Sequence, residues 1–256
     1  MNPQQVHLAH HDAPKQSIGK IAAKVFGWSL LIAVSFVGSQ FIVSAVIVAL
    51  ATLGLMGDVT TTLGMLIVRV VMYVAMAAMI AGWLWYRERK LRAADTGLKR
   101  LVQWRDIGLA ITGFIAYFVL TTIAMLIASR LPWFNADQQQ DLGISTHLFG
   151  TELLGAFIVL VVLTPLFEEI IFRGFLYGRL RKLRMPWWLP AVVVSVLFGL
   201  AHMQWNVGLD VFCLSMVACA LREITGSIWS GVLVHMAKNF IAFMLTFVAI
   251  QGIVGG

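Results

Sequence analysis

The chain has 256 residues, of which 60% are hydrophobic and 12% are charged. A soluble domain carries roughly 25% charged residues, so this composition excludes an ordinary soluble globular protein and indicates a membrane protein. The net charge of +7 does not indicate nucleic-acid binding, because the basic residues lie in particular loops between apolar stretches. We therefore expect the lipid bilayer as a partner, and no nucleic acid.

Seven apolar segments follow one another along the chain, and each is a candidate for a membrane helix. A helix needs ~20 mainly apolar residues to cross a bilayer. The fourth segment is long for one straight span, and the fifth and sixth are short, so six to eight spans fit the pattern. The sequence predicts an all-α, polytopic membrane helix bundle of about seven spans: Val25–Leu50, Leu63–Tyr86, Ile107–Ser129, His147–Tyr177, Trp187–His202, Val207–Leu221 and Ser227–Ile250.

Basic residues separate the loops into two groups. If the amino terminus is cytoplasmic, most of the 19 Lys and Arg residues fall in the segments that face the cytoplasm. This bias is what the positive-inside rule requires. We therefore expect a multi-pass protein of the cell membrane, with its amino terminus in the cytoplasm and its carboxyl terminus outside.

Six of the polar residues within the last four apolar segments form a recurring pattern. An ionisable side chain inside a membrane costs several kcal/mol by the conservative scales, so each one calls for a partner or a function. Glu169 and Arg173 are four residues apart with the acid first, which favours an ion pair on one helix face. Glu168 is rotated by ~100° from that pair and is left free for chemistry. The six are Glu168, Glu169, Arg173, His202, His235 and Asn239.

The depth of two of these residues can be compared. Glu168 and His202 are equally far along the chain from a turn near Met185, so an antiparallel helix pair places both ~25 Å from that turn. His235 and Asn239 are four residues apart and share one helix face. Pro165 is expected to kink the fourth helix just before the glutamates.

The residue types indicate hydrolysis of a peptide bond. A carboxylate in apolar surroundings is a stronger base near neutral pH, so Glu168 with His202 would deprotonate a water molecule. His235 and Asn239 would stabilise the negative charge that develops on the attacked carbonyl. In the alternative, zinc bound by Glu168, His202 and His235 acidifies the water. The spacing does not decide between these versions.

Three motifs together resemble the signature of a known family. Glu168-Glu169-x-x-x-Arg173, Phe198-x-x-x-His202 and His235-x-x-x-Asn239 are similar to the motifs of the CPBP family, the CaaX-protease and bacteriocin-processing group, also called Abi proteins. The resemblance covers residues 164–240. It implies an all-helical intramembrane endopeptidase whose substrates are membrane-associated proteins or peptides of CaaX or leader type.

The resemblance also implies roles for the residues. Glu168 is the principal base, His202 is its partner, and His235 with Asn239 forms the oxyanion or metal group. Glu169 and Arg173 support them. Members are described as metalloproteases, and a metal-free glutamate mechanism has also been proposed for the CaaX branch. We accordingly divide the chain into an amino-terminal arm, a three-span region and a catalytic core: residues 1–24, 25–146 and 147–256.

Two other functional classes stay open. A non-catalytic immunity or scaffold protein of the same fold would tolerate replacement of Glu168. A proton-coupled transporter would use the buried Glu and His residues as a relay. Outside the motifs, we expect Arg69 to snorkel or to be paired, without a catalytic part, and Lys238 to pair with Asp210 or Glu152.

Overall fold

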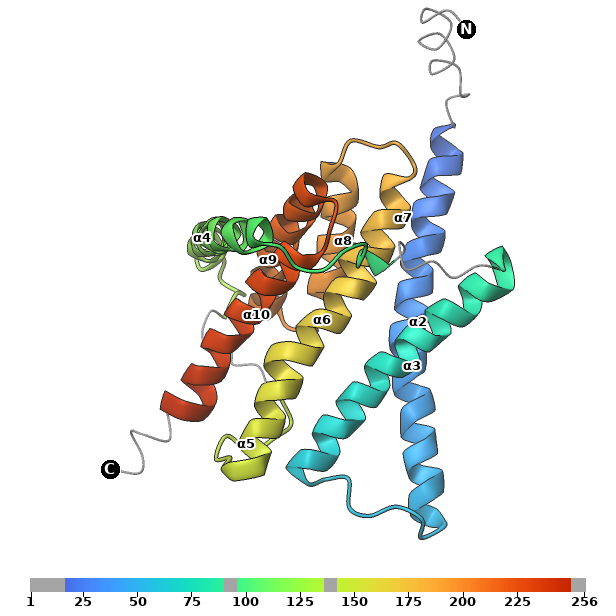
Figure 1. The fold of residues 1–256 in the computed structure, drawn as a ribbon, viewed down its shortest axis with the longest axis vertical. Coiled ribbons are helices and arrows are strands. Elements are labelled where there is room, and N and C mark those ends of the chain that lie inside the picture. The colour runs from blue at the N-terminus through green and yellow to red at the C-terminus, as the bar shows by residue number, and fades with distance from the viewer. Residues whose placement is uncertain (1–16, 90–95, 136–141, 250–256) are drawn as a thin grey trace, which may run out of the picture.

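Every regular element of the described chain is helical. The computed structural model describes residues 17–89, 96–135 and 142–249, and Figure 1 shows their arrangement as an elongated bundle. Two long helices come first and lie against each other, and a third follows a loop. They are α2 (Ile18–Thr52), α3 (Thr62–Glu88) and α4 (Trp104–Ala128).

The fourth apolar segment folds as one composite helix. Its parts alternate between α-helical and π-helical hydrogen bonding. The remaining chain forms three further helices, the last of which also ends in a π-helical stretch. The parts are α5 (Gly150–Phe157), η2 (Ile158–Leu163), α6 (Thr164–Glu168), η3 (Glu169–Tyr177) and α7 (Gly178–Arg181), followed by α8 (Trp188–Leu200), α9 (Trp205–Thr225), α10 (Trp229–Phe243) and η4 (Met244–Ala249).

The all-α membrane fold is confirmed. Among the described residues, five helices are long and apolar enough to cross a membrane. They are α2, α3, α4, the composite helix α5–α7, and α10 with η4. Helices α8 and α9 occupy the two segments predicted to be short. Helix α2 begins at Ile18 rather than at Val25, so it extends into the predicted arm.

Some of the predictions concern parts of the chain that are not described. Residues 1–16 of the predicted arm and residues 250–256 lie outside the described ranges. The sides of the membrane assigned to the two termini therefore stay predictions.

The composite helix occupies the centre of the bundle. Half of its most apolar 18-residue window is buried, against 28% or less for the other four long helices. Figure 1 shows α6 between α3 and α10. Side chains of η3, such as Phe172 and Leu176, form the main hydrophobic core with residues of α3 and α8, among them Ile80 and Val194. Glu168, Glu169 and Arg173 of this helix are buried, so they face other helices rather than lipid.

Proline changes the helix geometry at the predicted kink. Pro165 lies in the first turn of α6, directly after the π-helical stretch η2. Proline has no N–H group, so the usual bond from that position to an earlier carbonyl cannot form. The helix accommodates this by a change of hydrogen-bond register, and π-helical stretches lie on both sides of α6.

Helices α8 and α9 pack closely because glycines face each other. A Cβ atom built on Gly199 would lie 2.8 Å from the carbonyl oxygen of Gly208, and one built on Gly208 would lie 3.0 Å from the carbonyl oxygen of Gly199. Small residues allow helix backbones to approach in this way within membranes. The contact positions the turn that carries His202.

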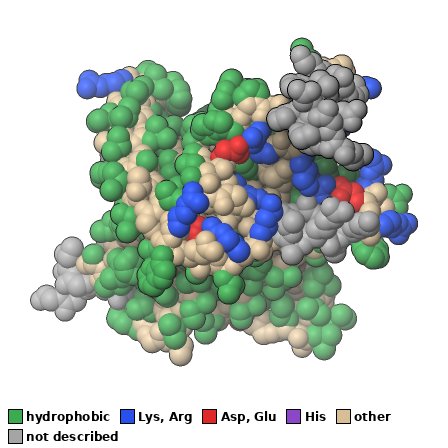
Figure 2. All heavy atoms as spheres, turned by 45° about the horizontal axis from the view of Figure 1, so that its top comes forward, with side chains coloured by type: hydrophobic (Ala, Val, Ile, Leu, Met, Phe, Trp, Pro, Cys, Tyr) green, Lys and Arg blue, Asp and Glu red, His purple; other side chains and the backbone are tan. Residues whose placement is uncertain are grey.

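Charged side chains gather at the end of the bundle where α7 ends. Figure 2 shows a group of Lys and Arg side chains with a few acids among them, next to broad hydrophobic surfaces. At this end Arg179 lies 2.5 Å from Glu88, and Arg181 lies 2.5 Å from Glu223. This is the end to which the sequence assigns the cytoplasmic side.

Candidate active site

The predicted pair between Glu169 and Arg173 is present, and it is completely buried. Nη1 of Arg173 lies 2.9 Å from Oε1 of Glu169, and both side chains have an exposed fraction of 0%. The guanidinium carbon of Arg173 also lies 4.4 Å from the centre of the Phe198 ring. A cation over an aromatic face is favourable when both are desolvated. Two neighbouring groups therefore stabilise the buried charge of Arg173.

Helix α10 approaches Glu169 through a glycine and a histidine. Nδ1 of His235 lies 3.2 Å from Oε1 of Glu169. One turn earlier, a Cβ atom built on Gly231 would lie 3.0 Å from Oε2 of Glu169. A larger residue at position 231 would push against the carboxylate, so glycine lets α10 bring His235 close to it.

His235 lies between the two adjacent glutamates. While its Nδ1 faces Glu169, its Nε2 lies 3.6 Å from Oε2 of Glu168. His235 and Glu168 are nearly inaccessible, with exposed fractions of 2% and 8%. A carboxylate on one ring nitrogen fixes the orientation of an imidazole and the chemistry of the other nitrogen. Glu169 is therefore placed to orient His235, and His235 is placed to act beside Glu168.

A tyrosine from the second predicted span completes the surroundings of Glu168. The hydroxyl of Tyr73 in α3 donates a hydrogen bond of 2.5 Å to Oε1 of Glu168. Its ring stacks on Phe167 with centroids 5.7 Å apart. The sequence analysis missed Tyr73. The available signal was the spacing Arg69-x-x-x-Tyr73, which places two polar side chains on one face of an otherwise apolar helix.

Asn239 makes a contact that the sequence analysis did not predict. Its amide nitrogen donates a hydrogen bond of 2.8 Å to the backbone carbonyl of Leu160. In η2, the backbone N–H of Thr164 donates to the carbonyl of Val159, five residues earlier. In the same π-helical register, the carbonyl of Leu160 would accept from the residue at position 165, which is Pro165. Because Pro165 has no N–H group, Asn239 supplies the missing donor. Its predicted part in stabilising an oxyanion stays a prediction.

His202 lies beside the glutamate cluster without bonding to it. It follows α8 in a turn, where its Nδ1 is 2.9 Å from the carbonyl oxygen of Phe198. The Phe198 ring contacts both histidine rings, with centroid distances of 5.0 Å to His202 and 5.9 Å to His235. No hydrogen bond or ion pair within the described ranges joins His202 to Glu168. The depth estimate thus placed His202 near Glu168. The bond from His202 to the carbonyl of Phe198 is the kind that a histidine makes when it caps the end of a helix.

The three predicted metal ligands do not form a closed metal centre among the described residues. Tetrahedral zinc needs at least three protein donors at ~2 Å from one point. In the part of the chain that the structure describes, no three His, Cys, Asp or Glu side chains are grouped to hold a metal ion. Glu168 and His235 are neighbours, and Nδ1 of His202 faces a backbone carbonyl, which leaves its Nε2 available as a ligand. Zinc held by Glu168, His202 and His235 therefore stays a prediction.

A second polar cluster lies next to the site. Nζ of Lys238 is 3.4 Å from Oδ2 of Asp210, so of its two predicted partners it pairs with Asp210. The other oxygen of Asp210 accepts hydrogen bonds from Tyr117 at 2.6 Å and from Thr121 at 2.9 Å. These contacts join α4, α9 and α10, and they account for the lysine beside Asn239.

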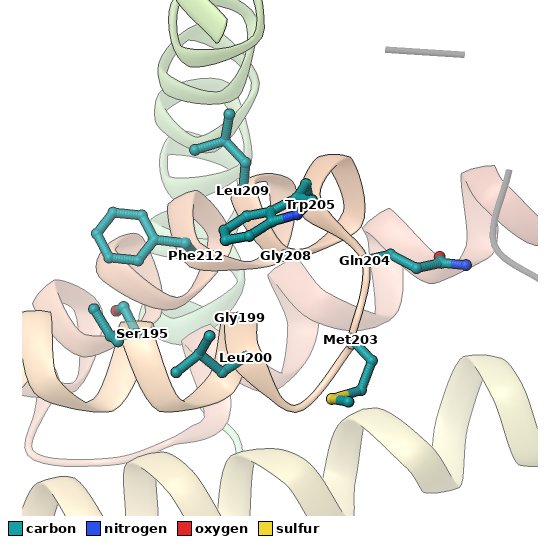
Figure 3. A pocket seen from close by; sticks show the side chains of 10 residues that line it. Ser195, Gly199, Leu200, Met203, Gln204, Trp205, Gly208, Leu209 and Phe212 are labelled. Atoms are coloured by element: carbon teal, nitrogen blue, oxygen red, sulfur yellow. The ribbon is translucent and has the colours of Figure 1, made fainter. Parts of the chain in front are cut away.

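The groove between α8 and α9 is separate from these clusters. It has a volume of about 380 Å³, and Figure 3 shows its lining side chains, which include Leu200, Trp205 and Phe212. None of the six predicted site residues lines it. The buried polar contacts, rather than the shape of the surface, therefore locate the candidate site.

A family model matches the part of the chain that contains the cluster. Residues 150–241 match the family model described as Type II CAAX prenyl endopeptidase Rce1-like. This range contains all six residues selected from the sequence, and the match confirms the resemblance to the CPBP family. No solved structure matches the chain.

Three curated proteins are similar to parts of the chain. The uncharacterized protein YyaK of Bacillus subtilis is 31% identical over 158 residues, which are 57% of this chain and 49% of that protein. An uncharacterized 24.3 kDa protein of Escherichia coli is 31% identical over 92 residues, 34% of this chain and 42% of that protein. YdiL of Bacillus subtilis, whose name provisionally describes a membrane peptidase, is 25% identical over 159 residues, 60% of this chain and 64% of that protein. The chain thus spans about half the length of the curated relatives it matches.

Proposed function

Because residues 150–241 match the Rce1-like family, we propose that the protein is an intramembrane endopeptidase that hydrolyses membrane-associated proteins or peptides of CaaX or leader type. The observation that supports this best is the buried group formed by Glu168, Glu169 and His235. It places a carboxylate beside an oriented imidazole inside the membrane region. General base catalysis by a positioned carboxylate contributes about 10²- to 10⁴-fold to a rate.

The proposed reaction begins at Glu168. Glu168 takes a proton from water while the water oxygen forms a bond to the carbonyl carbon of the substrate, and the C=O π electrons move to the carbonyl oxygen. His235, with both ring nitrogens protonated, donates from Nδ1 to Glu169 and from Nε2 to that oxygen. Arg173 balances the charge of Glu169. A group that stabilises charge only in the transition state accelerates the chemical step.

The second step returns the proton. When the tetrahedral intermediate collapses, the carbonyl re-forms, the C–N bond breaks, and the leaving nitrogen receives the proton that Glu168 carried. The products are a carboxylic acid and an amine, and Glu168 is a carboxylate again. This scheme uses Glu168 as the base and passes through no metal, and the chelator experiment separates it from the zinc-dependent version.

The test is peptide cleavage by the purified protein in lipid nanodiscs. Quenched fluorescent peptides of CaaX and leader type are compared for the wild type, for Glu168→Gln, and for Glu152→Gln as a matched control at the start of the same composite helix. We expect Glu168→Gln to lose at least about 100-fold in kcat and Glu152→Gln to retain activity. A zinc chelator is expected to leave the wild type active.

Each contrary outcome points to a different function or mechanism. Equal activity of Glu168→Gln and the wild type would remove Glu168 as the base. Loss of activity with the chelator, restored by added zinc, would establish the metal-dependent version. A wild type that cleaves no peptide of either type would favour the non-catalytic immunity or scaffold function.

A further inference from the structure

Arg69 carries a charge in the membrane region, and it forms no ion pair with an acid among the described residues. It lies in α3, is partly buried, and donates a hydrogen bond of 3.0 Å from Nη2 to the backbone carbonyl of Leu142. Within residues 17–89, 96–135 and 142–249, no Asp or Glu lies within ion-pair distance of it. A charged residue at such a depth is costly and by default indicates a function with an identifiable partner.

The position of Arg69 relates it to the candidate active site. Arg69 lies one helical turn before Tyr73, so the two side chains share a face of α3. Its charge is close enough to act on the Tyr73 hydroxyl, which donates to Glu168. At ~1.5 Å rise per residue, the backbone of Arg69 lies ~6 Å from that of Tyr73 along the helix axis. Arg69 is therefore a neighbour of the proposed catalytic carboxylate and not a part of it.

Thr164 adds a second polar group at the same place. It lies one turn before Glu168 on the composite helix, and its hydroxyl borders the phenol of Tyr73. The Thr164 hydroxyl is buried, and its contact with the Tyr73 hydroxyl lacks the geometry of a full hydrogen bond. A buried hydroxyl that is only partly satisfied is able to bond to a further group, such as a ligand group that is bound only during function. Arg69 precedes Tyr73 by one turn, and Thr164 precedes Glu168 by one turn. Because Tyr73 is bonded to Glu168, Arg69 and Thr164 lie on the facing sides of α3 and the composite helix.

We propose that Arg69 and Thr164 form a subsite for a carboxylate of the substrate. The proposal rests on the proposed peptidase function. A guanidinium presents paired N–H donors that match the two oxygens of a carboxylate. An extended peptide advances ~3.3 Å per residue, so a carboxylate two to three residues beyond the scissile bond lies ~7–10 Å from it. This distance suits a subsite that lies more than one helical turn from Glu168. Such a carboxylate is either the terminus of the substrate chain or the side chain of an Asp or Glu.

Cleavage of matched peptides tests the subsite. One peptide is prepared with a free terminal carboxylate and with a terminal amide, and a second pair carries either Glu or Gln two residues beyond the cleaved bond. We expect the wild type to cleave one carboxylate form with a kcat/KM about 10- to 100-fold higher than its amide counterpart, mainly through KM. The pair that shows the difference identifies the source of the carboxylate.

Variants of Arg69 decide whether this preference depends on its charge. Arg69→Gln is expected to cleave the carboxylate and amide forms equally, Arg69→Lys to keep part of the preference, and Thr164→Val to reduce it. Arg130→Gln, in an exposed position after α4, is the matched control and should keep the wild-type preference. Because the ratio of two substrates is taken within each variant, loss of folded protein does not change it. A preference that persists unchanged in Arg69→Gln would overturn the proposal.

A binding measurement separates this proposal from the peptidase function. The Glu168→Gln protein in nanodiscs is titrated with the labelled carboxylate and amide peptides, alone and combined with Arg69→Gln. We expect the carboxylate form to bind about 10-fold or more tightly, and the difference to disappear when Arg69 is replaced. Equal binding of the two forms overturns the subsite even if cleavage is observed. Preferential binding without cleavage by the wild type supports the subsite and contradicts the peptidase.

Discussion

The hydroxyl of Tyr73 and the carboxylate of Glu168 are joined by a hydrogen bond of 2.5 Å between α3 and the composite helix. The two residues are far apart in the sequence, and Tyr73 lies outside residues 150–241, which match the Rce1-like family. The candidate active site is therefore built from more of the chain than its three motifs. Because Tyr73 belongs to α3, the position of α3 affects the environment of Glu168, the proposed base.

Replacement of Tyr73 by Phe tests the importance of this bond. The aromatic ring and its stacking on Phe167 remain, while one hydrogen bond to a charged group is lost. Because the bond positions Glu168 for the reaction, we expect kcat to fall about 10- to 100-fold with a small change in KM. Peptide cleavage and thermal unfolding are measured on the same preparation, and the melting temperature should fall by a few degrees, because a bond to a charged group also contributes about 1.5–3 kcal/mol to stability.

Tyr117→Phe is the matched control for this prediction. Tyr117 also donates to a partly buried carboxylate, that of Asp210, but it does not contact Glu168. An equal loss of kcat in both variants would show that the effect is a general one of removing a buried hydroxyl. Unchanged kcat in Tyr73→Phe would mean that the bond to Glu168 has no part in the reaction.

Replacement of Arg173 by Met should destabilise the protein strongly. Glu169 would keep its buried charge without the neighbouring guanidinium, and breaking a buried pair in this way costs about 3–5 kcal/mol. The double variant Glu169→Gln with Arg173→Met removes both charges and should recover a large part of that loss. The free energy of unfolding is measured by denaturant titration in mixed micelles.

The exposed pair at the basic end provides the comparison. The side chains of Arg181 and Glu223 are 31% and 35% exposed, so Arg181→Met should cost about 0–1 kcal/mol. If Arg173→Met were as mild as Arg181→Met, the pair with Glu169 would not stabilise the fold. If the double variant were no more stable than Arg173→Met, Arg173 would act through the Phe198 ring rather than through Glu169.

The helices and the ion pair could be predicted from the sequence because they depend on local patterns. Long apolar runs specify membrane helices, and a four-residue spacing specifies which side chains share a helix face. Those rules located Glu169 beside Arg173. They also grouped the motifs in the carboxyl-terminal half, which matches the Rce1-like family.

The contacts between distant segments could not be predicted in the same way. Helical spacing states which residues share a face, but it does not state which helix that face meets. The analysis therefore missed Tyr73, and it assigned Asn239 to chemistry without its bond to Leu160. It placed His202 near Glu168 from depth alone and did not predict the bond from Nδ1 of His202 to its own helix. The joint action of His202 and Glu168 stays a prediction.

The hydrogen bond from Asn239 to Leu160 leads to a prediction that separates structural from catalytic loss. Asn239→Ala leaves the Leu160 carbonyl without a donor, because the backbone partner in π-helical register would be Pro165. An unsatisfied buried carbonyl costs about 1–3 kcal/mol, and we expect the free energy of unfolding to fall by that amount. Pro165→Ala supplies an N–H group, so in that background Asn239→Ala should cost much less.

Activity measured on the same four proteins tests the second role predicted for Asn239. If Asn239 stabilises an oxyanion as well, Asn239→Ala lowers kcat in both backgrounds, even where Pro165→Ala has removed the cost in stability. A kcat that recovers together with stability in the double variant would show that Asn239 acts only by holding the helix. An equal cost in stability in both backgrounds would contradict the structural account, because it would mean that Asn239 does not replace the donor that proline lacks.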